Sequence, residues 1–228
     1  MHSLVLKRFF QISVAILVQA ALLFISSGRL DWAMAWAYLG IGVAVVAINA
    51  LILLPRNLEL VAERAQIVKE GVKSWDKQLA SIHGVFGPAA TLIVAGLDAR
   101  FGWSPQLGLI VQCGALVCVA LGYGLCSWAL ASNRFFSCLV RIQKERGHTV
   151  ITTGPYRIVR HPGYLGMAMF SLATPLMLGS LWALIPAGLT VCVLIVRTVL
   201  EDRTLQEELD GYTDYARHVR FRLLPGVW

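Results

Sequence analysis

Long apolar segments dominate the hydropathy pattern of this chain. A bilayer core of about 30 Å needs roughly 20 apolar residues in a helix to cross it. Four segments meet that length: Phe9 to Ser26, Trp32 to Leu54, Leu79 to Leu97 and Leu107 to Ala131. Two further apolar segments, separated only by Gly179 and Ser180, predict a tight helical hairpin: Tyr164 to Leu178 and Leu181 to Leu200. The pattern predicts an all-α integral membrane protein with about six transmembrane helices.

The composition agrees with a membrane protein. The chain is 57% hydrophobic and 14% charged, whereas soluble domains carry about 25% charged residues. This balance excludes a disordered chain. We therefore do not interpret the net charge of +7 as a nucleic-acid-binding surface. The five cysteines form no C-x-x-C pair, so we predict neither a disulfide framework nor a metal site.

The basic residues predict the orientation of the predicted spans. Arg29 and Arg100 fall on one side of the membrane, and the other eighteen Lys and Arg residues fall on the opposite side. By the positive-inside rule, both termini are expected in the cytoplasm. The first apolar segment is long for a signal peptide and no A-x-A site follows it, so we interpret it as a span. The stretch from Asn57 to Lys77 mixes charged and apolar residues and predicts an amphipathic helix at the cytoplasmic interface.

Polar chemistry concentrates in two cytoplasmic stretches, Asn133 to Tyr164 and Arg197 to Arg222. In the first, Gly154 allows a close approach of the backbone, and two prolines stiffen turns. Arg157, Arg160 and His161 supply hydrogen-bond donors for a carboxylate or phosphate. The stretch therefore suits an anionic part of a cofactor.

In the second stretch, Arg197 precedes Glu201 by one helical turn, so the two side chains share a helix face. Glu201 has the chemistry to bind ribose hydroxyls or an ammonium group, and Arg197 the chemistry to bind a substrate carboxylate. An ordinary ion pair with snorkelling at a helix end explains the spacing equally well.

Several activities lack their usual sequence support. The chain contains no H-E-x-x-H, G-x-S-x-G, Walker or G-x-G-x-x-G motif. An ion-coupled transporter usually needs charged residues at membrane depth, and Asn49 and Gln112 offer little for such a path. A non-enzymatic membrane or transport protein nevertheless stays open.

The two polar stretches resemble the isoprenylcysteine carboxyl methyltransferase family. The first carries His148-Thr149, then Gly154-Pro155-Tyr156, then Arg160-His161-Pro162-Gly163-Tyr164-Leu165-Gly166. The second carries Arg197, Glu201-Asp202, Leu205, Tyr212, Tyr215, Val219 and a Leu-Pro ending. The resemblance covers roughly the last 100 residues. The first four spans resemble the family only in general plan, or follow less characterised bacterial relatives of it. Phospholipid N-methyltransferases share much of this pattern, and membrane sterol reductases share it more distantly.

The resemblance implies one membrane methyltransferase domain over residues 1–228. Residues 1–131 would form four spans. Residues 132–228 would form the cofactor-binding loop, the helical hairpin and a C-terminal cap. The cofactor implied is S-adenosylmethionine, and Arg197 matches the arginine that binds the substrate carboxylate. The cofactor contacts implied are Gln143, His148, Thr149, Val150, Ile151, Tyr156, His161, Pro162, Gly163, Tyr164 and Glu201. Two features depart from the family pattern: Asp202 replaces the second Glu of a Glu-Glu pair, and the loop between Gln143 and His148 is short.

The implied acceptor is a lipophilic carboxylate that enters from the bilayer of a bacterial inner membrane, with no obligatory protein partner. Such a carboxylate is already ionised near pH 7, so we assign no general base and no catalytic residue. An amine or thiol acceptor would have to lose a proton, which Glu201 or His161 could accept. The alternatives are phospholipid N-methylation and a membrane reductase that uses NADPH.

Overall fold

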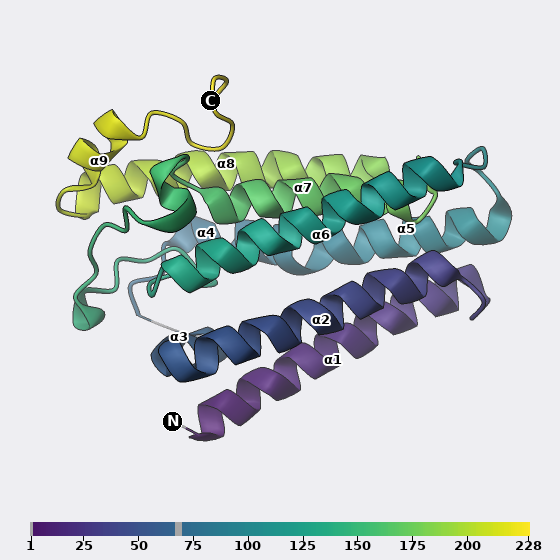
Figure 1. Ribbon diagram of the computed structural model, residues 1–228, viewed down its shortest axis with the longest axis horizontal. Helices are drawn as coiled ribbons and strands as arrows, with labels where there is room; N and C mark the ends of the chain where they lie inside the picture. The colour runs from purple at the N-terminus through teal and green to yellow at the C-terminus, as the bar shows by residue number, and fades with distance from the viewer. Residues whose placement is uncertain (1, 67–69) are drawn as a thin grey trace.

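The computed structural model describes residues 2–66 and 70–228, and all of its regular elements are helices (Figure 1). No strand occurs in these two ranges. A π-helical turn, Ile82–Phe86, joins α4 to α5, and short 3-10 turns occupy Lys144–Arg146 and Gly154–Arg157. The helices are α1 (His2–Ser27), α2 (Ala33–Arg56), α3 (Leu58–Ala65), α4 (Ser74–Ser81), α5 (Gly87–Phe101), α6 (Leu109–Ser132), α7 (Pro162–Met177), α8 (Leu184–Glu208) and α9 (Tyr212–His218).

Five helical segments in the described ranges are long and apolar enough to cross a membrane. They are Ser3–Ser27, Ala33–Arg56, Ser74–Phe101, Leu109–Ser132 and Leu184–Glu208. The expectation of an all-α, multi-pass membrane protein is confirmed. The predicted fifth span corresponds to α7, which has only 16 residues and does not reach the length of the other five. The count of six spans therefore stays a prediction.

The α7–α8 hairpin has the tight turn that its sequence predicts. Gly179 adopts a positive φ of 80°, and the Ser180 N–H donates to the Pro175 carbonyl over 2.9 Å. Helix α7 packs closely on α6: a Cβ on Gly122 would lie 2.8 Å from the Gly166 carbonyl oxygen. Small residues allow such backbone approach between membrane helices. Helix α7 therefore packs on α6 and α8.

The expected amphipathic helix over Asn57 to Lys77 is wrong in its extent. The first part forms α3, which ends at Ala65, while Ser74 already begins the third apolar segment. Asn57 caps α3, since its side chain accepts from the Leu60 N–H over 3.1 Å. Leu60 is fully buried, because α3 packs against α1 and α2. The interfacial prediction also included residues 67–69, which lie outside the described residues.

The elements that build the site gather at one end of the helix bundle. Figure 1 shows α3, α4, α9 and the chain between α6 and α7 at the same end of the bundle as the N-terminus. At the opposite end, the buried Asp98 carboxylate accepts from the Ser104 N–H over 2.7 Å and from the Ser180 hydroxyl over 2.5 Å. The bond from Ser180 links the end of α5 to the turn of the α7–α8 hairpin and so stabilises the end of the bundle opposite the polar loops.

Candidate functional site

A cavity of about 580 Å³ opens at the end of the bundle where the polar loops meet. Its wall draws on α1, α3, the π-helical turn, the chain between α6 and α7, and helices α7, α8 and α9. This volume falls in the range of small-molecule sites. The π-helical turn adds His83, Gly84 and Val85 to the wall, and such turns are frequent at functional sites.

Ten of the twelve sequence-predicted site residues line this cavity. They are His148, Thr149, Val150, Ile151, Tyr156, His161, Gly163, Tyr164, Arg197 and Glu201. Gln143 and Pro162 are buried beside it and do not line it. The Gln143 amide donates to the Phe135 carbonyl over 2.7 Å and accepts from Arg146 Nη1 over 2.5 Å. Both polar ends of Gln143 therefore brace its own loop.

Arg197 is held by a partner that the sequence pattern does not reveal. Its Nε and Nη2 donate to the two carboxylate oxygens of Asp76 over 2.6 and 3.0 Å. His83 Nε2 accepts from Nη1 over 2.7 Å, and the Cys138 carbonyl accepts from Nη2 over 2.9 Å. These contacts use four of the five guanidinium N–H donors. The Asp76 and Arg197 side chains are 0% and 4% exposed, so the pair is buried.

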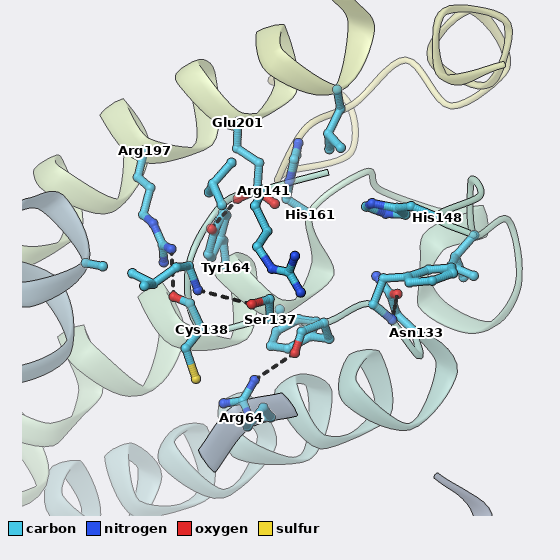
Figure 2. Close-up of a pocket in the computed structure, with 18 of the residues that line it drawn as sticks. Arg64, Asn133, Ser137, Cys138, Arg141, His148, His161, Tyr164, Arg197 and Glu201 are labelled. Carbon is cyan, nitrogen blue, oxygen red and sulfur yellow. Dashed lines mark hydrogen bonds between the residues drawn. The ribbon is translucent and has the colours of Figure 1, made fainter. Parts of the chain in front are cut away.

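The ordinary Arg197–Glu201 ion pair is absent from the described residues. Glu201 instead accepts a short hydrogen bond from the Tyr164 hydroxyl, and the Arg197 guanidinium lies 5.4 Å from the Tyr164 ring centroid. In Figure 2, Arg197 and Glu201 both extend from α8 toward the cavity, and Arg197 reaches the chain at Cys138. Arg197 and Glu201 share a face of α8, but Arg197 pairs with Asp76 and Glu201 with Tyr164.

Asp202 is a buried junction between the motif loop and the C-terminal segment. Its side chain, 0% exposed, accepts from Arg160 Nε over 2.8 Å, from His161 Nε2 over 3.2 Å and from Arg222 Nε over 2.9 Å. The Tyr212 hydroxyl donates to it over 3.0 Å. The His161 N–H also donates to the Arg222 carbonyl over 2.9 Å. His161 therefore faces the cavity and also helps to hold the tail in place.

His148 lies against the Phe135 ring, with ring centroids 4.4 Å apart. Its Nδ1 accepts from the Gln143 N–H over 3.2 Å. Burial, reinforced by the positive charges of Arg146 and Arg141, lowers the pKa of His148 to about 4. His148 is therefore a neutral imidazole at physiological pH.

Tyrosines form much of the rest of the wall. Tyr156 is buried, its hydroxyl accepts from Asn133 Nδ2 over 3.2 Å, and its carbonyl accepts from the Tyr215 hydroxyl over 2.7 Å. Burial raises the pKa of both phenols well above 10, so both stay neutral. Tyr212 and Tyr215 of α9 also line the cavity.

Sequence reasoning missed several cavity residues on distant elements. Arg8 and Gln11 come from α1, Arg64 from α3, His83 from the π-helical turn and Arg141 from the chain after α6. Two buried polar atoms in the described residues have no hydrogen-bond partner, Gln11 Oε1 and Arg141 Nε, and both residues line this cavity. Buried polar atoms are nearly always paired. The free acceptor Gln11 Oε1 and the free donor Arg141 Nε therefore indicate that this cavity binds a polar ligand.

These features define an integral multi-pass membrane protein with a ligand cavity at one end of its helix bundle. Residues 113–208 match the model of the isoprenylcysteine carboxyl methyltransferase (ICMT) family. The resemblance to this family is therefore confirmed for residues 113–208, which include most of α6 and all of α7 and α8.

Curated relatives bear names from the same family. The chain is 30% identical over 125 residues to protein-S-isoprenylcysteine O-methyltransferase of Rattus norvegicus, a match that covers 50% of this chain and 42% of the relative. It is 30% identical over 108 residues to the enzyme of that name in Saccharomyces cerevisiae, covering 47% and 43%. It is 29% identical over 92 residues to protein-S-isoprenylcysteine O-methyltransferase B of Arabidopsis thaliana, covering 40% and 47%. Each match spans less than half the length of the relative.

Proposed function

We propose that this protein transfers a methyl group from S-adenosylmethionine to the carboxylate of a lipophilic acceptor of the isoprenylcysteine type. The observation that carries the proposal is the convergence of the two family motifs on one cavity: residues 148–151, His161, Gly163 and Tyr164 line the same cavity as Arg197 and Glu201 of α8. The names of the relatives support the same activity.

The cavity fits the cofactor by its chemistry. It combines aromatic and aliphatic walls with a carboxylate, a neutral imidazole and two unpaired polar atoms. We infer that Glu201 and His161 bind polar groups of the cofactor, and that residues 148–151, Tyr156, Gly163 and Tyr164 form the surrounding wall. Gln143 and Pro162 act by shaping the loop and the start of α7. When bound, S-adenosylmethionine supplies an electrophilic methyl group on a positively charged sulfur.

The acceptor carboxylate needs orientation more than proton transfer, because it is already ionised near pH 7. Arg197 retains one guanidinium N–H that no described residue accepts, and it borders the cavity beside Tyr164. We infer that this donor helps to orient the carboxylate toward the methyl group. Because the reaction joins opposite charges, a site that excludes water favours it.

Binding of S-adenosylhomocysteine to the purified protein, measured by calorimetry, tests the proposal first. We expect Glu201→Ala to weaken this binding about tenfold or more, because one charge-assisted contact is lost. Glu207→Ala is the matched control, since Glu207 is exposed and pairs with Arg203 on the same helix. Binding of NADPH in place of S-adenosylhomocysteine would contradict the proposal and favour a membrane reductase.

A methyl-labelling screen tests the acceptor. We expect label in prenylthioether carboxylic acids, and a raised KM for the acid in Arg197→Lys with unchanged affinity for S-adenosylhomocysteine. Label found only in phospholipid amines would replace the carboxylate proposal with phospholipid N-methylation.

A further inference from the structure

A second cavity of about 300 Å³ lies between α1, α2 and α6. Its wall is mostly apolar and includes Ile12, Val46, Leu53 and Leu130. Neither the sequence motifs nor the family match at residues 113–208 accounts for the α1 and α2 side of this wall.

Three residues belong to the walls of both cavities: Arg8, Arg64 and Phe136. Arg64 Nη1 donates to the Phe136 carbonyl over 3.0 Å, and Arg8 Nη1 lies 3.4 Å from the Arg64 carbonyl. Figure 2 shows Arg64 reaching the chain before Cys138 from the side opposite Arg197. The three residues therefore form a boundary that the polar cavity and the apolar cavity share.

The charge at this boundary is not balanced by the protein. In the described residues, neither Arg8 nor Arg64 pairs with a carboxylate, whereas Arg141, Arg160 and Arg197 each do. Partly buried cations normally have anionic partners, and two neighbouring cations repel each other. Arg197 is already neutralised by Asp76, so it attracts an anion less strongly than Arg8 and Arg64 do together.

We propose that this boundary binds a single-chain lipid carboxylate, with the anionic head at Arg64 and Arg8 and the hydrocarbon chain in the cavity between α1, α2 and α6. Two cations beside a mostly apolar cavity match an amphiphile and no fully polar ligand. The inference rests on the proposed function only in identifying this ligand with the methyl acceptor. All three arginines line the polar cavity, so the inference adds Arg64 and Arg8 to Arg197 as residues that determine acceptor specificity.

The test measures ligand binding without any methyl donor. Radiolabelled dodecanoate and dodecanol are dialysed against the full chain in lipid nanodiscs, with protein-free nanodiscs subtracted. We expect dodecanoate to bind about tenfold or more tightly than dodecanol, and Arg64→Gln to abolish that difference. Arg8→Gln provides a second test of the same charge if Arg64→Gln lowers the yield of folded protein. Arg203→Gln, which removes an exposed arginine, is the control and should keep the difference.

The hydrocarbon pocket is tested separately. Ala50 lines this cavity, and Ala47 is exposed on the same helix. We expect Ala50→Phe to weaken both ligands, because it fills the pocket, and Ala47→Phe to change neither. In the parent chain, affinity should rise about fourfold for each added methylene until the pocket is full.

The outcomes separate this inference from the proposed function. Retained dodecanoate preference in Arg64→Gln and Arg8→Gln, or unchanged binding in Ala50→Phe, would overturn it. A failure of the parent to bind S-adenosylhomocysteine would refute the proposed function, and the dodecanoate measurements would still decide the lipid site. Farnesylthiopropionate competing better than dodecanoate would support a prenyl acid as the source of the carboxylate; the opposite ranking would support a fatty acid at the same site.

Discussion

The buried Asp76–Arg197 pair allows the sharpest test of how the site is held. Asp76 lies in the first turn of α4 and Arg197 near the middle of α8, 121 residues apart in the sequence. The Asp76 carboxylate also accepts from the Val140 N–H over 2.6 Å. One side chain therefore joins α4, α8 and the chain that leads into the cofactor motif.

Asp76→Ala would leave the Arg197 cation buried without its carboxylate. Removing one partner of a buried ion pair costs about 3–5 kcal/mol. For a chain of this length, each kcal/mol shifts the Tm by about 2–4 °C. We therefore expect Asp76→Ala to lower the Tm by roughly 6–20 °C, measured by thermal unfolding in detergent micelles.

A control variant and a double variant test whether the stability loss comes from the buried charge. Asp214→Ala removes a pair with Arg217 in which both side chains are more than 70% exposed, and exposed pairs contribute only about 0–1 kcal/mol. Asp76→Leu combined with Arg197→Met removes both charges, and we expect it to lose no more stability than Asp76→Ala alone. A Tm change within 2 °C for Asp76→Ala, or losses that simply add in the double variant, would refute the buried-pair argument.

Three further predictions follow from the loop, the tail and the orientation. Burial lowers the pKa of His148 to about 4 in the folded chain, whereas the pKa of an unfolded histidine is about 6.5. The contribution of the neutral His148 to stability should therefore be complete above pH 6.5 and decline toward pH 4. A pH scan of the Tm of the parent and of His148→Gln checks this, and identical profiles would contradict it. Asp202→Asn should expose residues 219–228 to limited proteolysis while Asp210→Asn does not, and equal protection would contradict the role of Asp202 as a junction. In a cysteine-free background, an external thiol reagent should label a cysteine at Gly102 but not one at Gly147, and the reverse pattern would invert the predicted topology.

The helical class and the hairpin could be predicted because their signals are local. Apolar length alone identifies the long helices, and Gly179-Ser180 between two apolar segments identifies the turn. The boundaries were less predictable. The third span begins at Ser74, five residues before the expected Leu79, because the polar residues Asp76 and Lys77 there belong to the helix. Hydropathy assigns Asp76 to a loop, because the sequence does not reveal its buried partner Arg197.

Most of the candidate site could also be predicted, since ten of twelve proposed residues share one cavity. What the motifs could not reveal is the partner of each residue. Arg197 and Glu201 share a helix face, and that spacing favours a pair; the structure instead directs Arg197 to Asp76 and Glu201 to Tyr164. Arg8, Gln11 and Arg64 carry no motif, so only the packing of α1 and α3 brings them to the cavity.

One helix organises all of these contacts, and this affects how variants are interpreted. Within six residues, α8 presents Arg197 to α4, Glu201 to α7 and Asp202 to the C-terminal segment. A substitution at any of the three therefore removes a contact between helices as well as a group at the cavity. Neighbouring contacts of this kind do not add independently. A loss of cofactor affinity in Glu201→Ala consequently argues for direct binding only if the Tm is unchanged. Tyr164→Phe removes the hydroxyl that donates to Glu201 and leaves the carboxylate in place. This variant therefore separates the loss of the contact between α7 and α8 from the loss of the carboxylate at the cavity.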